Sequence, residues 1–222
     1  MEIIQDFIPE NRGNRPGYAM VPQYISLHDT ANPNATALNH AAYLSRNSVA
    51  ERLPVSWHFS VDDMNIVQHL PCNESGWHVG DGNNGPGNRR SIGIEICEFT
   101  DAGRRSKAEE NAAWLAAYLA DKFNIPVECI VQHHHWTGKN CPRVLRARTG
   151  GWAGFINMVK KNLQIYVDVP NDHWAAEEIR FCKANNLMVG TGKDKFEPDK
   201  PVTRAQLAVV AARLYDLLSE LK

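Results

Sequence analysis

The segment Ser91-Ile-Gly-Ile-Glu-Ile-Cys97 decides the fold, because it carries the most regular strand pattern in the chain. Its three isoleucines lie on one face and Glu95 lies on the other, since successive side chains of a strand point to opposite sides. An acid on the polar face of a strongly apolar strand requires a partner or a chemical role. Glu95 is therefore a candidate catalytic group, and an ion pair with Arg89 or Arg90 is the alternative.

Two further segments alternate in the same way and predict strands at 24–28 and 56–61, and a fourth candidate strand at 129–132 runs directly into the three histidines at 133–135. Helices are predicted at about 36–46, from a capping box at Ser106–Glu109 onward, and at about 152–161. Strands that alternate with helices are typical of a layered domain in which helices pack on a sheet. The expected fold class is therefore α/β, with a mixed central β-sheet flanked by helices.

The composition changes near residues 162–169, where a segment rich in Trp, His and Gly ends. We predict a first domain at 1–163 and a second at 164–222. The second has helix signals at 173–184 and after a capping box at Thr203–Gln206, which predict a small helical hairpin. The side chains expected to point inward are Trp174, Ile179 and Phe181 or Cys182 in the first helix, and Leu207, Val210, Ala211, Leu214 and Leu217 or Leu218 in the second.

Charge and hydropathy exclude several classes of protein. The 222 residues include 24 Lys and Arg against 25 Asp and Glu, so the net charge of -1 argues against a nucleic-acid binder. No apolar run approaches the roughly 20 residues that span a bilayer, so membrane insertion is not expected. The N-terminus lacks the basic and apolar regions of a Sec signal peptide. We therefore expect synthesis in the cytoplasm without a signal peptide.

The segment His133-His-His-Trp-Thr-Gly-Lys-Asn-Cys141-Pro142 carries the strongest chemical signal. Imidazole and thiolate are the preferred zinc ligands, and a catalytic zinc takes three ligands from the protein and leaves one position open. His133 and Cys141 could supply two ligands, and His28, at the end of a predicted strand, could supply a third. The chain has no closely spaced cysteine pair, which favours a catalytic over a structural site. The alternatives are a solvated histidine-rich loop and a buried cysteine.

These residues belong to a larger set of motifs in a characteristic order. The motifs are Tyr24–Thr30, Ser56–Asp63, Trp77–Arg89, Ser91–Glu95 and His133–Pro142. Through them the first domain resembles the zinc-dependent N-acetylmuramoyl-L-alanine amidases of the type-2 amidase group. The resemblance implies the fold of that group, bound Zn2+ and a peptidoglycan substrate. It also implies cleavage of the amide that joins N-acetylmuramic acid to L-alanine of the stem peptide.

The resemblance assigns roles to individual residues. It implies His28, His133 and Cys141 as the zinc ligands, and it selects His133 over the two histidines that follow, which spacing alone leaves open. Glu95 is implied as the general base and Lys139 as the group that stabilises the oxyanion.

Other side chains are candidates for contact with the substrate. Those predicted to bind it are His58, Trp77, Arg89 and Trp136. Core packing is the alternative for both tryptophans, and plain hydrogen bonding is the alternative for His78 as a cleft residue. The glycine-rich run at 80–87 is expected to form a wall of the cleft, because it precedes a strand, whereas phosphate-binding loops precede a helix.

The second domain resembles a surface-layer homology (SLH) module. The matching segments are Val167–Ala175, Phe196–Pro198 and Val202–Gln206. Such modules bind acidic, pyruvylated secondary cell-wall polymers. The resemblance implies that Thr203 and Arg204 contact the polymer, although Gln replaces the acidic residue that closes the module's Thr-Arg-Ala-Glu segment. A guanidinium in the first turn of a helix suits an anion, and surface solvation is the alternative for Arg204.

These resemblances predict a peptidoglycan hydrolase of the phage or prophage endolysin type, which lyses the host by acting on its wall after release from the cytoplasm. The alternatives are a bacterial autolysin, a non-catalytic peptidoglycan-binding protein, and a hydrolase that uses Cys141 as its nucleophile. Because the net charge is near zero, affinity for an anionic wall is expected to come from the second domain.

Overall fold

The computed structural model describes residues 2–46, 54–164, 166–170, 173–192 and 194–219. The chain divides into two compact units, Met1–Asn162 and Leu163–Lys222. Among the described residues, none of the helices has both the length and the apolar character needed to cross a membrane.

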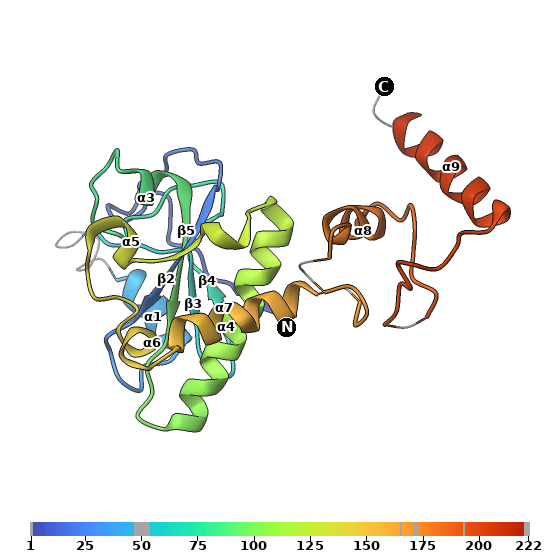
Figure 1. The fold of residues 1–222 in the computed structure, drawn as a ribbon. Helices are drawn as coiled ribbons and strands as arrows, with labels where there is room; N and C mark the ends of the chain where they lie inside the picture. The colour runs from blue at the N-terminus through green and yellow to red at the C-terminus, as the bar shows by residue number, and fades with distance from the viewer. Residues whose placement is uncertain (1, 47–53, 165, 171–172, 193, 220–222) are drawn as a thin grey trace. The chain divides into compact units, whose positions relative to one another are not determined.

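Within the described residues, a six-stranded sheet forms the centre of the first unit (Figure 1). In sheet order its strands are β1 (Ile3–Gln5), β4 (Ile66–Gln68), β3 (Phe59–Val61), β5 (Ser91–Ile96), β2 (Tyr24–Asp29) and β6 (Ile130–Gln132). Strands β3 and β4 are antiparallel, and the other neighbours are parallel. The mixed sheet confirms the predicted fold class, although β3 and β6 are shorter than the predicted strands.

Strands β5 and β2 are the longest neighbours in the sheet. Their register pairs His28 with Glu95, and β6 lies on the other side of β2. The isoleucines at 92, 94 and 96 are completely buried, as the alternating pattern predicts. Because the carboxyl ends of parallel strands meet at one edge of a sheet, His28, Glu95 and the residue after β6 are brought to the same place.

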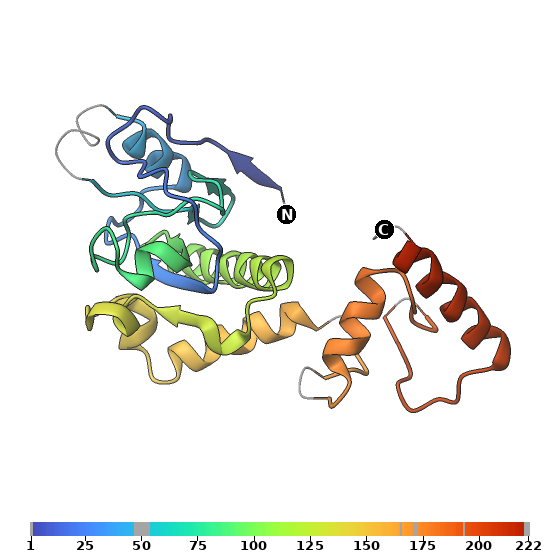
Figure 2. The same ribbon diagram turned by 90° about the horizontal axis from the view of Figure 1, so that it is seen from above.

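Helices flank this sheet. They are α1 (Ala37–Leu44), α3 (Pro86–Arg90), α4 (Ala102–Phe123), α5 (His134–Thr137), α6 (Arg143–Ala147) and α7 (Gly151–Leu163), with a 3-10 turn η1 (Val127–Cys129) before β6. The long helix α4 packs along β2, β3 and β5, whereas α1 packs against β3 and β4. Figure 2 shows α4 running alongside the strands. The helices predicted at 36–46 and 152–161 correspond to α1 and α7.

Helix α4 begins earlier than predicted. Its N-cap is Asp101, whose carboxylate accepts a hydrogen bond from the N–H of the third helical residue at 2.8 Å. The predicted capping box at Ser106–Glu109 is wrong, because the Glu109 carboxylate is buried and accepts hydrogen bonds from Arg105 and Arg148 instead. Glu109, which the sequence suggested as part of a helix N-terminus, therefore lies inside the helix and belongs to an ion-pair network.

The second unit contains helices α8 (Ala176–Ala184) and α9 (Arg204–Ser219), joined by a long connection (Figure 2). The capping box predicted at the start of α9 is confirmed. The Thr203 N–H donates to Oε1 of Gln206 at 2.9 Å, and the Gln206 N–H donates to Oγ1 of Thr203 at 3.2 Å. Two helices were expected in this region, and both form.

The core of the second unit differs from the predicted one. One cluster of its buried residues consists of Tyr166, Val169, Ala176 and Ile179, with Phe196 packed against them, and Leu187 is buried as well. The exposed fraction of Trp174 is 87%, so its predicted inward position is wrong; of the two alternatives Phe181 and Cys182, Phe181 is 57% exposed and Cys182 is half-buried. No described residue of α9 is buried, and its predicted inward stripe is wrong as well. Side chains from the loops before α8 and α9 fill the core in place of those from α9.

Candidate metal centre and its surroundings

Three side chains converge at the carboxyl ends of β2 and β6. His28 lies near the end of β2, and His133 directly follows β6, where its N–H donates to the Leu27 carbonyl at 3.1 Å. Cys141 lies between α5 and α6, and its carbonyl accepts a hydrogen bond from the His134 N–H at 3.0 Å. Two parallel strands and one short loop therefore build the cluster.

The ligand atoms of His28, His133 and Cys141 all lie within 4.8 Å of one another. Nδ1 of His28 is 2.9 Å from Nδ1 of His133 and 3.9 Å from the Cys141 sulfur. The exposed fractions of the three residues are 1%, 4% and 6%, whereas His134 and His135 are exposed. The structure thus brings together the three residues that the sequence singled out.

A count of protons shows that this cluster suits a cation. Four contacts follow one another through three histidines. The Val79 carbonyl is 2.9 Å from Nε2 of His133, and Nδ1 of His133 is 2.9 Å from Nδ1 of His28. Nε2 of His28 is 3.0 Å from Nδ1 of His78, and Nε2 of His78 is 3.3 Å from the Ser91 carbonyl. Each contact needs one proton, but three neutral imidazoles carry only three ring protons.

The fourth proton is difficult to supply. Burial lowers the pKa of His28 and of His78 well below its ordinary value, so an imidazolium is disfavoured at either position. A cation between the two Nδ1 atoms would take the place of the missing proton. Two imidazole nitrogens and a cysteine sulfur are the donor set that zinc prefers, with a fourth position left for water or substrate. The residues present therefore fit a zinc ion.

Glu95 lies beside this cluster on β5. Its Oε1 is 4.0 Å from Nδ1 of His28, and its Oε2 is buried without a hydrogen-bond partner among the described residues. Burial is the main cause that raises the pKa of Glu95 to about 8, and the charge of Asp29 adds to the effect. A buried carboxylate oxygen without a hydrogen bond lowers the stability of the fold, so its presence indicates that Oε2 contacts a group that the protein itself does not supply.

The alternative role for Glu95, an ion pair with Arg89 or Arg90, is not formed. Among the described residues, no arginine lies within ion-pair distance of this carboxylate. The Arg89 guanidinium instead lies over the ring of Tyr18, 4.4 Å from its centroid.

Lys139 lies two residues before Cys141 and is exposed. Its carbonyl accepts a hydrogen bond from the Cys141 N–H at 2.7 Å. Burial lowers the pKa of His133 to about 4, and the positive charge of Lys139 lowers it further. The same charge opposes the rise in the pKa of Glu95. The charge of Lys139 therefore favours the neutral form of His133 and the ionised form of Glu95.

His58 does not line a cleft, so its predicted role in substrate binding is wrong. The residue is completely buried, and both ring nitrogens have partners inside the protein. Nδ1 accepts a hydrogen bond from the Gly93 N–H at 3.0 Å, which leaves Nε2 to donate to the Glu74 carbonyl at 2.8 Å. Burial lowers the pKa of His58 to about 4, in keeping with a neutral structural imidazole.

The two tryptophans predicted to contact substrate are half-buried. Trp136 donates from Nε1 to Oγ of Ser26 at 2.8 Å, and its ring meets the Tyr24 ring edge-on. The Trp77 N–H donates to Oγ of Ser56 at 3.2 Å. One edge of Trp136 is thus anchored in the sheet, and contact with substrate stays a prediction for both residues and for Arg89.

A buried ion-pair network that the sequence did not predict lies beside the cluster. The Arg105 guanidinium donates to Asp29 at 2.6 Å and to Glu109 at 2.7 Å. The second oxygen of Asp29 accepts the Val144 N–H at 2.7 Å. Asp29 therefore joins β2, next to His28, to the segment that follows Cys141. An acid after a candidate ligand was visible in the sequence, but its arginine lies 76 positions away.

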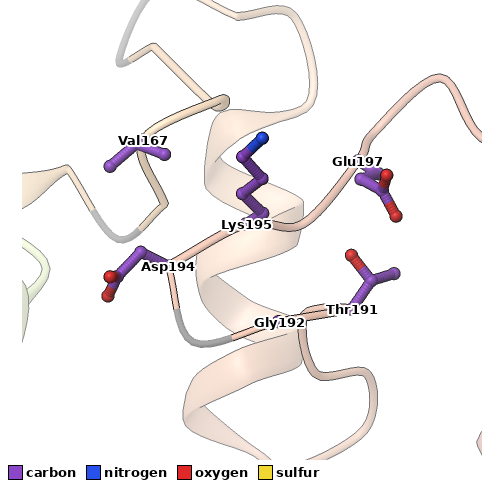
Figure 3. A pocket seen from close by; sticks show the side chains of 6 residues that line it. All are labelled: Val167, Thr191, Gly192, Asp194, Lys195 and Glu197. Carbon is purple, nitrogen blue, oxygen red and sulfur yellow. The ribbon is translucent and has the colours of Figure 1, made fainter.

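In the second unit, Thr203 and Arg204 are exposed at the start of α9. A pocket of about 490 Å3 in this unit is lined by Val167, Thr191, Gly192, Asp194, Lys195 and Glu197. Figure 3 shows Thr191 and Glu197 on one side of Lys195 and Asp194 on the other. Neither Thr203 nor Arg204 lines this pocket, so it lends no support to their predicted contact with a polymer.

Comparisons with known proteins agree with this arrangement. A family model described as N-acetylmuramoyl-L-alanine amidase matches residues 18–144, which is more than half of the chain. The amidase CwlH of Bacillus subtilis (strain 168) is 49% identical over 162 residues, covering 72% of this chain and 62% of CwlH. The amidase XlyA of the same strain is 54% identical over 147 residues, covering 65% of this chain and 48% of XlyA.

Solved structures extend the comparison. The catalytic domain of XlyA and a mutant endolysin from Bacillus subtilis each superpose with a TM-score of 0.65 at 50% identity, covering 72% of this chain and 99% of the other. A second family model, the S-layer homology domain, matches residues 165–208. The chain spans less than two thirds of the length of CwlH and XlyA. It belongs to the N-acetylmuramoyl-L-alanine amidase family, and an SLH domain follows its amidase domain.

Proposed function

We propose that this protein is a zinc-dependent peptidoglycan hydrolase that cleaves the amide between N-acetylmuramic acid and L-alanine of the stem peptide. The convergence of His28, His133 and Cys141 carries the proposal, together with the four contacts through His133, His28 and His78 that share only three ring protons. The family match and the amidases among its relatives support the reaction class. When bound, zinc at such a site lowers the pKa of water and polarises a carbonyl.

The chain's own residues supply the proton transfer and the charge stabilisation. Glu95 would take the proton of the attacking water at Oε2 and deliver it to the departing amine of L-alanine, a role supported by the lack of a partner for this buried oxygen among the described residues. Lys139 is exposed and electrostatically coupled to the cluster, so its ammonium group is suited to stabilising the oxyanion of the tetrahedral intermediate. The half-buried imidazole of His78 contacts the ligand His28 through a hydrogen bond of 3.0 Å.

Product analysis tests the proposed reaction. Incubation of purified peptidoglycan with the protein should release new N-termini of L-alanine without new reducing ends of sugars. Removal of zinc by a chelator should stop the release, and addition of zinc should restore it. New reducing ends would show a glycosidase and refute the proposal. Activity that survives in metal-free protein would refute the zinc requirement, and wall binding without any turnover would support the non-catalytic alternative.

The SLH domain is proposed to hold the protein on an acidic secondary cell-wall polymer. Arg204 is exposed at the first position of α9, where unpaired backbone N–H groups and a guanidinium can meet an anion. Thr203, the N-cap, presents its side chain at the same helix end. The amidase domain would then cleave peptidoglycan near the site of attachment.

Arg204→Ala is expected to weaken sedimentation with polymer-bearing cell walls by about tenfold, because one charge-assisted contact is lost. Lys200→Ala is the matched control, since it removes the same charge from an exposed side chain of the preceding loop, where Lys200 pairs with Glu197 three residues away. Equal losses for both variants would show a general charge effect and no specific role for Arg204.

We further propose that the protein acts in lysis of a bacterial host, as an endolysin. One similar structure carries that description, and it is 50% identical to this chain. A bacterial autolysin uses the same reaction and is the alternative. Expression of the protein in host cells with and without a membrane-permeabilising partner separates them, because an endolysin should lyse cells only when the partner opens the membrane.

A further inference from the structure

We propose that His78 is a positioning residue, which holds His28 in the tautomer that presents Nδ1 to the metal. This inference rests on the zinc centre proposed above. His78 touches neither His133 nor Cys141 through a hydrogen bond in the described structure, and its ring lies edge-on to that of His28, with 5.1 Å between the ring centroids. Its role is therefore exerted through His28.

The direction of each hydrogen bond follows from the contact between His78 and the Ser91 carbonyl, which is the last of the four. The Ser91 carbonyl can only accept, so Nε2 of His78 carries the proton in their 3.3 Å contact. A neutral imidazole with a proton on Nε2 has a lone pair on Nδ1. His28 must then donate from its own Nε2 across the 3.0 Å contact, and its Nδ1 is left without a proton.

Without His78 a different arrangement becomes available. His28 could place its proton on Nδ1 and donate it directly to Nδ1 of His133, 2.9 Å away. That hydrogen bond would satisfy both imidazoles and occupy the lone pair that a metal needs. The acceptor nitrogen of His78 thus decides whether His28 and His133 hydrogen-bond to each other or leave their Nδ1 lone pairs free to bind a metal.

The position of His78 is itself well fixed. Its N–H and that of Val79 both donate to Oδ1 of Asn88, at 2.9 and 3.1 Å. The ring packs over Gly93, where a Cβ atom would lie only 2.7 Å from Nδ1 of His78. Val79 in turn accepts the Nε2 proton of His133 through its carbonyl. One dipeptide, His78-Val79, therefore orients both imidazoles of the cluster.

The test compares three variants of the full-length protein. His78→Leu should weaken zinc affinity by about 10-fold to 100-fold, measured by competition with a chromophoric chelator. His78→Asn keeps a side-chain oxygen that can accept from His28, so it should recover most of the affinity. His69→Leu is the matched control, because His69 is also hydrogen-bonded, to Oγ of Ser60, and is buried, but it takes no part in the four contacts around His28.

Two further measurements separate positioning from a loss of structure. Thermal melts of the metal-free proteins identify any variant that fails to fold, and the visible spectrum of bound Co2+ reports a change in its ligands. In the zinc-loaded wild type, 15N NMR should show His28 with its proton on Nε2 and Nδ1 bound to the metal.

Coordination of His28 through Nε2 would overturn the proposal, as would a folded His78→Leu variant with unchanged zinc affinity. Equal weakening in His78→Leu and His78→Asn would also overturn it, because an acceptor would then not matter. Failure of the wild type to take up zinc would overturn the metal centre and this role together, whereas normal uptake with an unaffected variant would overturn only the role of His78.

Discussion

Cys141→Ser is expected to lose its zinc and its peptidoglycan turnover together, with a fall in rate on the order of 10³-fold or more. The Cys141 sulfur lies 3.9 Å from Nδ1 of His28, inside the group of ligand atoms that can surround one ion. A serine hydroxyl is a poor replacement for a thiolate ligand of zinc. Zinc content by elemental analysis and release of L-alanine N-termini are measured on the same preparation.

Glu95→Gln is the control for this experiment. Glu95 is beside the cluster and is not one of its three ligands, so the variant should retain zinc while its rate falls by about 10²-fold to 10⁴-fold. Cys141→Ser with full zinc and no turnover would instead identify Cys141 as a nucleophile. Full zinc with full turnover would show that the residue has neither role.

Arg105→Met is expected to lower the free energy of unfolding by about 3–5 kcal/mol. The substitution leaves the carboxylates of Asp29 and Glu109 buried without their main partner, and each is less than one tenth exposed. It also removes a hydrogen bond to the Cys97 carbonyl. Urea denaturation followed by circular dichroism gives the change, with the first unit's transition identified by tryptophan fluorescence.

The neighbouring Arg104→Met is the matched control for that substitution. Arg104 makes two hydrogen bonds to Asp63, so it also loses an ion pair, but its side chain is 42% exposed and solvent can replace the contact. Little change in the unfolding midpoint is expected for this variant. Comparable shifts for the two variants would mean that burial of the Arg105 network is unimportant for stability.

The strand pattern predicted the sheet for a simple physical reason. Alternation fixes which side chains share a face, so it placed Glu95 on the polar face of its strand, whereas the grouping of Glu95 with the three ligands was implied by the resemblance. The same alternation failed for His58. The central strands of this sheet are buried on both faces, and alternation does not distinguish a polar side chain facing a cleft from one facing a second core layer.

Contacts between distant parts of the sequence account for most of what was missed. Glu109 looked like part of a capping box, because its partner Arg148 lies 39 positions away. In the second unit, helical periodicity predicted α9 itself, but it could not show that loop residues such as Tyr166 and Phe196 fill the core. Helical periodicity shows which face of a helix is apolar, but it does not show which other segment packs against that face.

The separation of the proposed ligands along the chain would make a bound zinc ion a cross-link. His28 lies in β2 and His133, 105 positions later, directly follows β6, so an ion bound to both would close a loop that contains most of the amidase domain. Such an ion binds the folded chain far better than the unfolded one, and at 100 times its dissociation constant it adds about 2.7 kcal/mol to the free energy of unfolding. Loss of zinc would therefore shorten the lifetime of the protein in the presence of proteases as well as stop its chemistry.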